Sequence, residues 1–311
     1  MPSLSSPSKI WDSWLSQIGF LREVSPSYLR FLVGFGYYLG SPIEKDIWRV
    51  NRYNEGNDES RAITDYHEII EDDVSFLLSE QDPRRSEFSL KARFRNNDIW
   101  INSDVLRMQV EAANIQRFGL DNVNTICEIG GGYGQLALGF LLNRPQISYT
   151  IVDFPQILDV VKRWISYLDL GINVQLYDSL NEYDTSRSNP GLHLFPNNLL
   201  CSSSILNYDL GININSFCEM RTSQISHYMK LIKTTVFYSN NRDRQPNNHE
   251  LKNLSDLFSE LFDHIHPDPK AYLDNDYKKR VFIMGDLSRT TQIHIDKICG
   301  IRGLSMPGLL T

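Results

Sequence analysis

The residues best suited to chemistry lie in the stretch EIGGGYGQ, in which a short apolar run ends at Glu128 and leads into a glycine-rich turn. The glycines of this turn, directly followed by a helical pattern, are Gly130, Gly131, Gly132 and Gly134. Because glycine has no Cβ, such a turn brings backbone N–H groups close to a ligand at the start of a helix. The dinucleotide fingerprint GxGxxG would require glycine where Gln135 stands. The turn therefore disfavours a nicotinamide-dependent oxidoreductase.

Two acidic residues end neighbouring apolar runs, and their charge indicates which ligand the turn would hold. Glu128 stands at the mouth of the turn, where a carboxylate repels a pyrophosphate and attracts an ammonium group. A unit charge pair at about 4 Å contributes roughly 4 kcal/mol at an effective dielectric near 20. Asp153 ends the next run, SYTIVD, where an α/β sheet presents an acid to ribose hydroxyls, and we expect Phe154 against an adenine ring. The pattern favours S-adenosyl-L-methionine; the alternative is a tight strand-to-helix turn without a ligand.

Polar side chains follow the later runs DLGINI and TVFYS. In an open α/β sheet ligands gather at the carboxyl ends of the strands, which points to residues 215–219 and 240–242. Methyl transfer to a hydroxyl needs a positioned nucleophile and a base. Glu219 is the first candidate for the general base, with capping of the next helix as its alternative, and His227 is the second. We expect cofactor or acceptor contacts from Asn215, Ser216, Asn240 and Arg242.

Two further clusters of charged or metal-binding residue types suggest other sites. One basic stretch could bind the phosphates of a nucleotide-sugar, although such a run is more often a solvated face; it contains Arg84, Arg85, Lys91, Arg93 and Arg95. The segment DHIHPD places His264 and His266 beside Asp263 and Asp268, residue types that can hold a metal, and His249 is a further candidate for the base. Since the strand ends carry mainly Asn rather than carboxylates, we expect a metal-free mechanism.

The segments EIGGGYGQL, IVDFP, DLGININSFCEM and HYMKLIKTTVFYSNNR together resemble the family of sugar O-methyltransferases. The resemblance covers about residues 90–245. It implies the seven-stranded methyltransferase sheet, S-adenosylmethionine as donor, and a sugar hydroxyl in a polysaccharide or glycoconjugate pathway as acceptor. It also implies that the glycine loop and Glu128 hold the methionine part and Asp153 the ribose. Asn215, Ser216 and Glu219 correspond to the family's NxxSxxEM-like stretch, and Gly211 puts the regularity of the preceding strand in doubt.

Other acceptors and roles stay open. A phenolic or other natural-product hydroxyl would use the same cofactor site with a different helical cap. A non-catalytic methyltransferase-fold protein would bind the cofactor product and serve as a partner. Acceptor profiling separates the first from a sugar methyltransferase.

The 311 residues divide into two textures. Residues 1–120 are expected to be all helical, acting as a cap, substrate or oligomerisation region, with helices at 63–80 and 103–119. Residues 121–311 alternate short apolar runs with amphipathic stretches, which predicts a Rossmann-like α/β domain with helices on both faces of the sheet. Helices are expected at 135–143 and 155–171, and strands at 125–129, 148–153, 172–177, 192–195, 209–214, 235–239 and 281–287.

Composition limits the partners. A formal net charge of -7 argues against a protein that grips nucleic-acid phosphates. The beginning of the chain lacks a secretory pattern, and the longest apolar stretch, Phe31 to Leu39, is too short to span a bilayer, so we expect a cytoplasmic protein acting on a small molecule or glycan. The four cysteines are scattered without a zinc or disulfide pattern. The sequence has no sustained heptad repeat, and the alternatives of a monomer and a homo-oligomer stay open.

Overall fold

The protein is described by a computed structural model that places most of the chain between Ser8 and Met284. The described residues are 8–9, 11–12, 15, 19–33, 77–87, 89–94, 97–117, 123–201, 205–243, 248–262, 265–267, 273–274 and 277–284. No described helix is long and apolar enough to cross a membrane.

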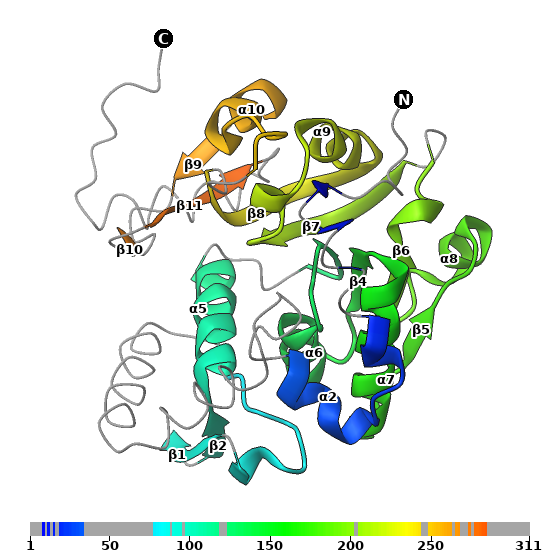
Figure 1. The fold of residues 1–311 in the computed structure, drawn as a ribbon, viewed down its shortest axis with the longest axis vertical. Coiled ribbons are helices and arrows are strands. Elements are labelled where there is room, and N and C mark those ends of the chain that lie inside the picture. The colour runs from blue at the N-terminus through cyan, green and yellow to red at the C-terminus, as the bar shows by residue number, and fades with distance from the viewer. Residues whose placement is uncertain are drawn as a thin grey trace.

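A large twisted sheet forms the centre of the fold (Figure 1). Its strands are β3 Thr125–Ile129, β4 Ser148–Asp153, β5 Val174–Leu176, β6 Gly191–Pro196, β7 Leu206–Ile214, β8 Ile232–Arg242, β9 Ile265–Pro267, β10 Leu273–Asp274 and β11 Tyr277–Met284. The order is β10-β11-β8-β7-β3-β4-β6-β5, with β9 paired to β11. Six neighbouring strands are mutually parallel: β8, β7, β3, β4, β6 and β5. Strand β11 is antiparallel to β8.

These elements confirm the predicted α/β class. Each of the seven predicted strands overlaps a strand of the sheet, and the predicted helices at 135–143 and 155–171 correspond to α6 Gln135–Asn143 and α7 Pro155–Leu168. Strands β4 and β6 are buried along their whole length, as expected for parallel strands covered on both faces. Strand β7 is continuous through Gly211, where a side chain would overlap the ring of Phe237. Glycine at this position thus makes room for a neighbour and does not interrupt the strand.

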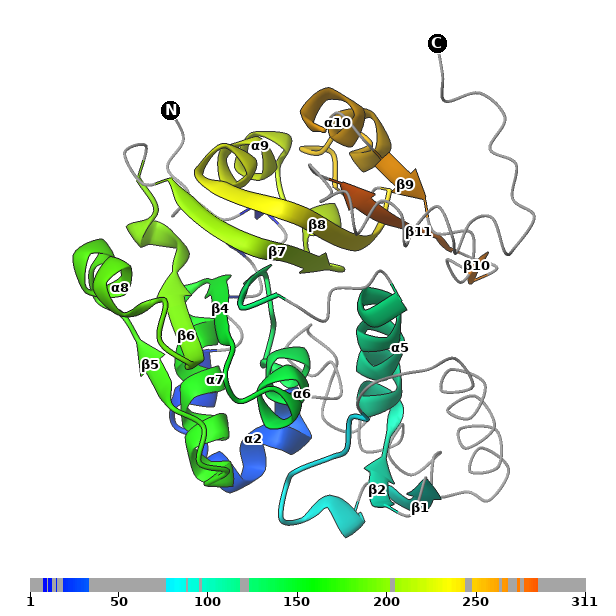
Figure 2. The ribbon, with the colours of Figure 1, turned by 180° about the vertical axis from the view of Figure 1, so that it is seen from behind.

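Helices cover both faces of the sheet (Figures 1 and 2). One core contains apolar residues of α6, α7, α2 Pro26–Val33 and α5 Ser103–Arg117. The other contains residues of α8 Leu180–Ser186, α9 Thr222–Leu231 and α10 Leu254–Leu261. Short 3₁₀ helices lie at η1 Gly19–Arg22, η3 Arg85–Glu87, η5 Asn197–Leu199 and η6 Phe217–Glu219.

The prediction that residues 1–120 are all helical is wrong. An antiparallel hairpin, β1 Leu90–Phe94 and β2 Asn97–Ile101, precedes α5. Residues 77–80, the end of the helix predicted at 63–80, are not helical, and most of that helix lies outside the described residues. Apolar residues alternate in β1, and its Leu90 and Ala92 pair with Ile101 and Ile99 of β2, both of which are buried. The domain boundary near residue 120 stays a prediction.

Helix α5 connects the hairpin of the N-terminal region to the sheet (Figure 2). Its cap is Asn102 rather than the predicted Ser103, which is the first helical residue. The Asn102 side-chain oxygen accepts hydrogen bonds from the backbone N–H groups of Asp104 (3.1 Å) and Val105 (3.0 Å), which caps the helix start. From there α5 runs from the hairpin towards β7 and β8.

Candidate functional site

The carboxyl ends of β3 and β7 meet at the point where the strand order reverses. From β3 the chain continues to β4 on one side, whereas β7 and β8 lie on the other. In open α/β sheets ligands bind in this position, outside the carboxyl ends of the strands. The glycine turn, Glu128 and Asp153 all lie at this edge, as the sequence predicted.

The glycine turn joins β3 to α6 in a left-handed backbone conformation. Gly130, Gly132 and Gly134 have φ of 75°, 56° and 84°. The turn is closed by the Gly134 N–H, which donates to the Gly131 carbonyl at 3.0 Å. A Cβ on Gly130 would lie 2.5 Å from the Cβ of Ser216 and closer still to its Oγ. The glycine at this position therefore allows the loops after β3 and β7 to touch.

Glu128 is a buried carboxyl at the end of β3, with 4% of its surface exposed. Its Oε2 accepts a hydrogen bond of 2.9 Å from the Tyr149 hydroxyl. Burial raises the pKa of Glu128 to about 7; the Tyr149 hydrogen bond acts in the opposite direction, and the charges of Asp153 and Glu111 add to the rise. An ammonium group beside Glu128 would favour its ionised form. The role of Glu128 in holding a cationic ligand stays a prediction.

Asp153 ends β4 beside the glycine turn. Burial raises the pKa of Asp153 to about 7, and the backbone N–H groups of Phe154 and Gly132 counteract this rise. The Phe154 N–H donates to Asp153 Oδ1 at 2.7 Å. The half-buried Phe154 ring lies 5.6 Å from the ring of Trp11, measured between centroids. A residue from the beginning of the chain therefore contacts the ring that was predicted to face adenine.

The loop after β7 is held by a set of side-chain amides. Asn213 donates from Nδ2 to the Ile129 carbonyl of β3 at 2.6 Å, and its Oδ1 accepts from the Phe217 N–H at 3.0 Å. The same Oδ1 accepts from Asn241 of β8 at 2.8 Å. Asn215 follows in a left-handed conformation, φ 56°, and its N–H donates to the Asn240 carbonyl at 2.9 Å. The structure thus brings the predicted residues 215–219 and 240–242 together.

A buried carboxylate that sequence reasoning missed joins this edge from α5. Glu111, 2% exposed, accepts a hydrogen bond of 2.7 Å from Asn240 Nδ2 and one of 2.6 Å from the Tyr238 hydroxyl. The same hydroxyl accepts from Asn114 at 3.4 Å. The signal in the sequence is one acid among Val105, Met108, Ala112 and Ile115, the apolar positions of the helix.

Four amide oxygens at this edge show that the residues present fit a polar ligand. Among the described residues, each of these oxygens is buried and accepts no hydrogen bond: Gln135 Oε1, Gln156 Oε1, Asn197 Oδ1 and Asn240 Oδ1. They lie at the starts of α6 and α7, directly after β6, and near the end of β8. Buried polar groups normally have hydrogen-bond partners, so these oxygens are suited to donors on a bound molecule. Sequence reasoning had assigned only Asn240 to the site.

The predicted catalytic residues lie in different places. Glu219 is buried in η6, between β7 and α9, and its N–H donates to the Ser216 carbonyl at 3.1 Å. His227 lies half-buried on α9, which runs back towards the amino ends of the strands. Arg242 is half-buried at the end of β8, and His249 is exposed in the loop beyond it. Of the two candidates for the base, Glu219 is therefore nearer the carboxyl ends.

The remaining predicted clusters are dispersed or lie outside the described residues. The Arg84 guanidinium stacks over the ring of Tyr28 and that of Arg85 over Trp100. Lys91 and Asp98 form an exposed ion pair of 2.8 Å across the hairpin, as expected of a solvated face. Arg93 is exposed, and Arg95 lies outside the described residues. Of the DHIHPD cluster only His266 lies on a described strand, whereas His264, Asp263 and Asp268 lie outside the described residues.

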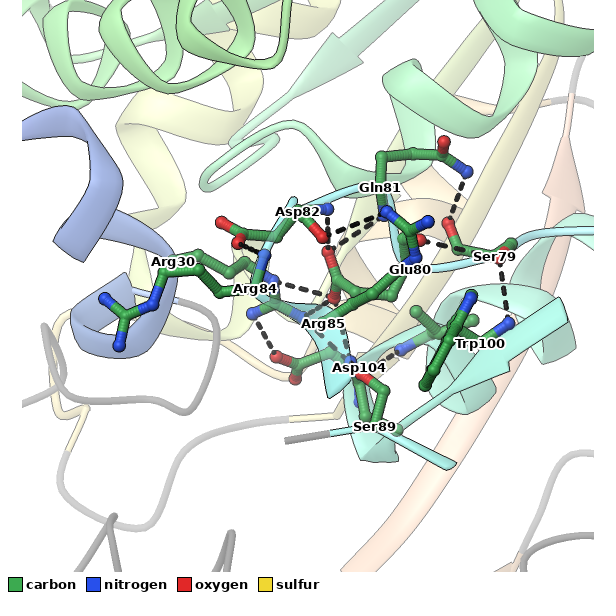
Figure 3. Close-up of polar contacts among 12 residues, drawn as sticks. Arg30, Ser79, Glu80, Gln81, Asp82, Arg84, Arg85, Ser89, Trp100 and Asp104 are labelled. Carbon is green, nitrogen blue, oxygen red and sulfur yellow. Dashed lines mark hydrogen bonds and ion pairs between the residues drawn. The ribbon is translucent and has the colours of Figure 1, made fainter. Parts of the chain in front are cut away.

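A buried ionic cluster joins α2 to residues 80–82 and to the start of α5 (Figure 3). The Arg30 guanidinium on α2 contacts Glu80 at 2.6 Å and Asp104 at 3.1 Å. Glu80 also accepts from Asn102 at 2.8 Å. Arg30 further stacks over the ring of Tyr133, 5.1 Å from its centroid, and Tyr133 belongs to the turn GGGYG. The cluster therefore couples α2, residues 80–82 and the start of α5 to the turn.

Comparison with known proteins gives only distant likenesses. No protein-family model and no curated protein matches the chain. One similar solved structure is mitomycin 7-O-methyltransferase MmcR, 12% identical with a TM-score of 0.34; the match covers 58% of this chain and 56% of that one. An O-methyltransferase family protein from Burkholderia thailandensis is 13% identical with a TM-score of 0.38, covering 78% and 72%. The S-adenosylmethionine-dependent methyltransferase SibL is 12% identical with a TM-score of 0.37, covering 80% and 77%. The chain spans little more than half of the first of these proteins. Likenesses of this degree assign no activity, so function rests on the site residues.

Proposed function

We propose that the chain is an S-adenosylmethionine-dependent O-methyltransferase that acts on a sugar hydroxyl in polysaccharide or glycoconjugate biosynthesis. One observation carries the proposal. Two buried carboxyl groups, Glu128 and Asp153, end the adjacent parallel strands β3 and β4 on either side of a left-handed glycine turn. This arrangement suits a ligand with a cationic end and a ribose, and it disfavours the pyrophosphate of a nicotinamide cofactor.

Each part of S-adenosylmethionine would be bound by different residues of the site. Glu128 would pair with the methionine ammonium, the glycine turn would approach its backbone, and Asp153 would accept from the ribose hydroxyls. Phe154 and the Asn197 amide oxygen lie on the side of β4 and β6, where the adenine would follow. When bound, S-adenosylmethionine supplies a methyl group on a positively charged sulfur.

The other side of β3 would receive the acceptor. Asn240 and Ser216 are buried on this side, and Asn215 is half-buried. Such amide and hydroxyl groups suit an acceptor with several hydroxyls better than a flat aromatic one. This chemistry, together with the resemblance of the sequence to sugar methyltransferases, supports a sugar as the acceptor. A phenolic acceptor is the second candidate, since it needs only a different lining on this side.

Glu219 is the proposed general base, with His227 the second candidate. The acceptor oxygen would form the new bond to the methyl carbon while the carbon–sulfur bond breaks, leaving its electron pair on sulfur. The hydroxyl proton would pass to the Glu219 carboxylate. Burial of Glu128, Asp153 and Glu219 keeps water away from these groups.

The test is transfer of isotopically labelled methyl groups from S-adenosylmethionine to an acceptor panel. The panel contains free hexoses, nucleotide-sugars and catechol, and Asp153→Asn serves as the inactive control. Labelled methyl ethers on a sugar would support the proposal. Preference for catechol would replace the sugar by a phenolic acceptor. Tight binding of S-adenosylhomocysteine without transfer to any acceptor would favour a non-catalytic binding protein.

A further inference from the structure

Glu111 and Asn240 form a buried pair that no feature of the sequence had connected. Glu111 lies on α5, in the N-terminal region, and Asn240 lies near the end of β8. The Asn240 Nδ2 donates to Glu111 Oε1 at 2.7 Å, and the Tyr238 hydroxyl donates to the other oxygen at 2.6 Å. The pair therefore ties the N-terminal region to the acceptor side of the sheet.

This pair fixes the direction in which the Asn240 amide points. A carboxylate only accepts hydrogen bonds, so Asn240 must present its NH₂ group to Glu111. The Asn240 oxygen is then turned away from Glu111, and it is buried without a hydrogen-bond partner among the described residues. A group bound beside this oxygen must donate a hydrogen bond or carry positive charge.

The register of the sheet places the pair opposite the proposed methionine site. Glu128 of β3 pairs with Ile212 of β7, and Ile212 pairs with Tyr238 of β8. Ile214, two positions further along β7, pairs with Asn240. Residues paired across a parallel sheet project from the same face, so Glu128 and Tyr238 share a face. Asn240 projects from that face too, because it lies two residues beyond Tyr238, nearer the carboxyl edge. The influence of the Glu111 charge on the Glu128 pKa agrees with this proximity.

The order of the strands then decides which part of the cofactor meets Asn240. With a ribose at Asp153 of β4 and an ammonium group at Glu128 of β3, a sulfonium between them would lie near β3. A methyl group directed at the proposed acceptor residues would then point towards β7 and β8, on the other side of β3. Asn240 is on that side.

We propose that Glu111 is a positioning residue that holds the Asn240 amide oxygen, backed by its own negative charge, towards the sulfonium methyl group and the acceptor hydroxyl. This inference rests on the proposed function and adds a requirement for the acceptor. The acceptor must place a hydrogen-bond donor, a hydroxyl, beside the methyl group of S-adenosylmethionine. Glu111 acts through Asn240 and does not itself touch the substrate.

Calorimetric titration with S-adenosylmethionine and S-adenosylhomocysteine tests this pair. The two ligands share the ammonium and ribose and differ in the sulfur-bound methyl group and the positive charge that it gives the sulfur. We expect Glu111→Gln to weaken S-adenosylmethionine binding about tenfold, the scale of a lost charge interaction, while S-adenosylhomocysteine binding changes less than about twofold. The exchanged variant Glu111→Gln/Asn240→Asp restores a donor facing an acceptor and the negative charge. It should regain the preference for S-adenosylmethionine.

Two comparisons separate this role from structural support. Tyr238→Phe removes a hydrogen bond to the same carboxylate but keeps the Glu111–Asn240 pair, so its ratio of the two affinities should equal that of the wild type. Equal weakening of both ligands by Glu111→Gln, or no regain in the exchanged variant, would overturn the inference and leave the proposed function intact. If the wild type binds neither ligand, the proposed function fails and the inference fails with it.

Discussion

Gly130 and Ser216 touch where the loops after β3 and β7 meet: a Cβ on Gly130 would lie 2.5 Å from the Cβ of Ser216. Two segments 86 positions apart in the sequence are thereby packed at the centre of the site. The contact makes the shape of the glycine turn depend on the loop that carries the proposed acceptor residues.

Gly130→Ala should therefore be costly for two reasons, the positive φ and the overlap with Ser216. Gly171 has φ 70°, and a Cβ added there would meet no atom within 4 Å, so Gly171→Ala isolates the first reason. We expect a loss of about 1 kcal/mol in the free energy of unfolding for Gly171→Ala and about 3 kcal/mol for Gly130→Ala. Adding Ser216→Gly should recover part of the larger loss. Urea unfolding checks this, and equal losses at both glycines would contradict the proposed contact.

The stability of the ligand-free protein should fall as the pH rises through the range set by Glu128. The pKa of Glu128 is about 7 in the folded chain against an ordinary value of 4.5. Between these values the unfolded chain ionises while the folded chain keeps its proton, so stability is lost as pH rises and the full loss is present above pH 7. Glu128→Gln should remove this loss and stabilise the protein by up to about 3 kcal/mol at pH 8 but not at pH 4. Glu260→Gln, at an exposed position of α10, is the control. A Glu128→Gln effect that is the same at both pH values would contradict the burial of an ionisable carboxyl here.

The ionic cluster around Arg30 should contribute far more to the free energy of unfolding than an exposed ion pair does. Arg30→Met would leave Glu80 and Asp104 buried without their cation, at an expected loss of about 3 to 5 kcal/mol. Lys91→Met breaks the exposed pair with Asp98 and should cost at most about 1 kcal/mol. Thermal unfolding of both variants measures the difference. Since Arg30 also stacks over Tyr133, Arg30→Met should in addition weaken cofactor binding; equal stability of the two variants would show that the cluster is not the support described.

Asn213 should be intolerant of its nearest isostere. Asn213→Asp replaces the donor to the Ile129 carbonyl by a second acceptor while keeping the acceptor for the Phe217 N–H. Placing two acceptors in contact in a buried position should cost at least about 2 kcal/mol and should lower affinity for S-adenosylhomocysteine. Asn207→Asp, at an exposed position on the same strand, is the matched control. If both variants bind S-adenosylhomocysteine like the wild type, Asn213 does not hold the loop in its binding shape.

Much of the sheet was predictable, because parallel strands buried on both faces appear as short apolar runs; the run at β4 is buried at every position. The hairpin β1–β2 was missed because its alternating lysine and arginine side chains were interpreted as a basic stretch. Between these charged residues lies Ala92, which pairs with Ile99 and packs against the buried Ile99 and Ile101 of β2. A period of two over five residues is a weak signal beside the strong helical pattern of α5 that follows.

The site was predictable only where one local motif contains its residues. The turn from Glu128 to Gly134 and Asp153 follow directly from strand ends, so the structure places them together as expected. Glu111 and Trp11 reach the site through tertiary packing of the N-terminal region, and no spacing in the sequence links them to β8 or Phe154. The direction of the Asn240 amide likewise depends on a partner 129 positions away.

Calorimetric titration of the wild-type protein with S-adenosylmethionine, S-adenosylhomocysteine and NADH tests the proposed cofactor site most directly. The titrations are repeated with Asp153→Ala and with Asp256→Ala, an exposed control on α10. We expect the wild type to bind both methyl-cycle ligands in the micromolar range or tighter and to give no heat with NADH. Asp153→Ala should lose this binding, whereas Asp256→Ala should keep it. Binding of NADH in place of S-adenosylmethionine, or no binding of either methyl-cycle ligand, would show that this is not a methyltransferase cofactor site.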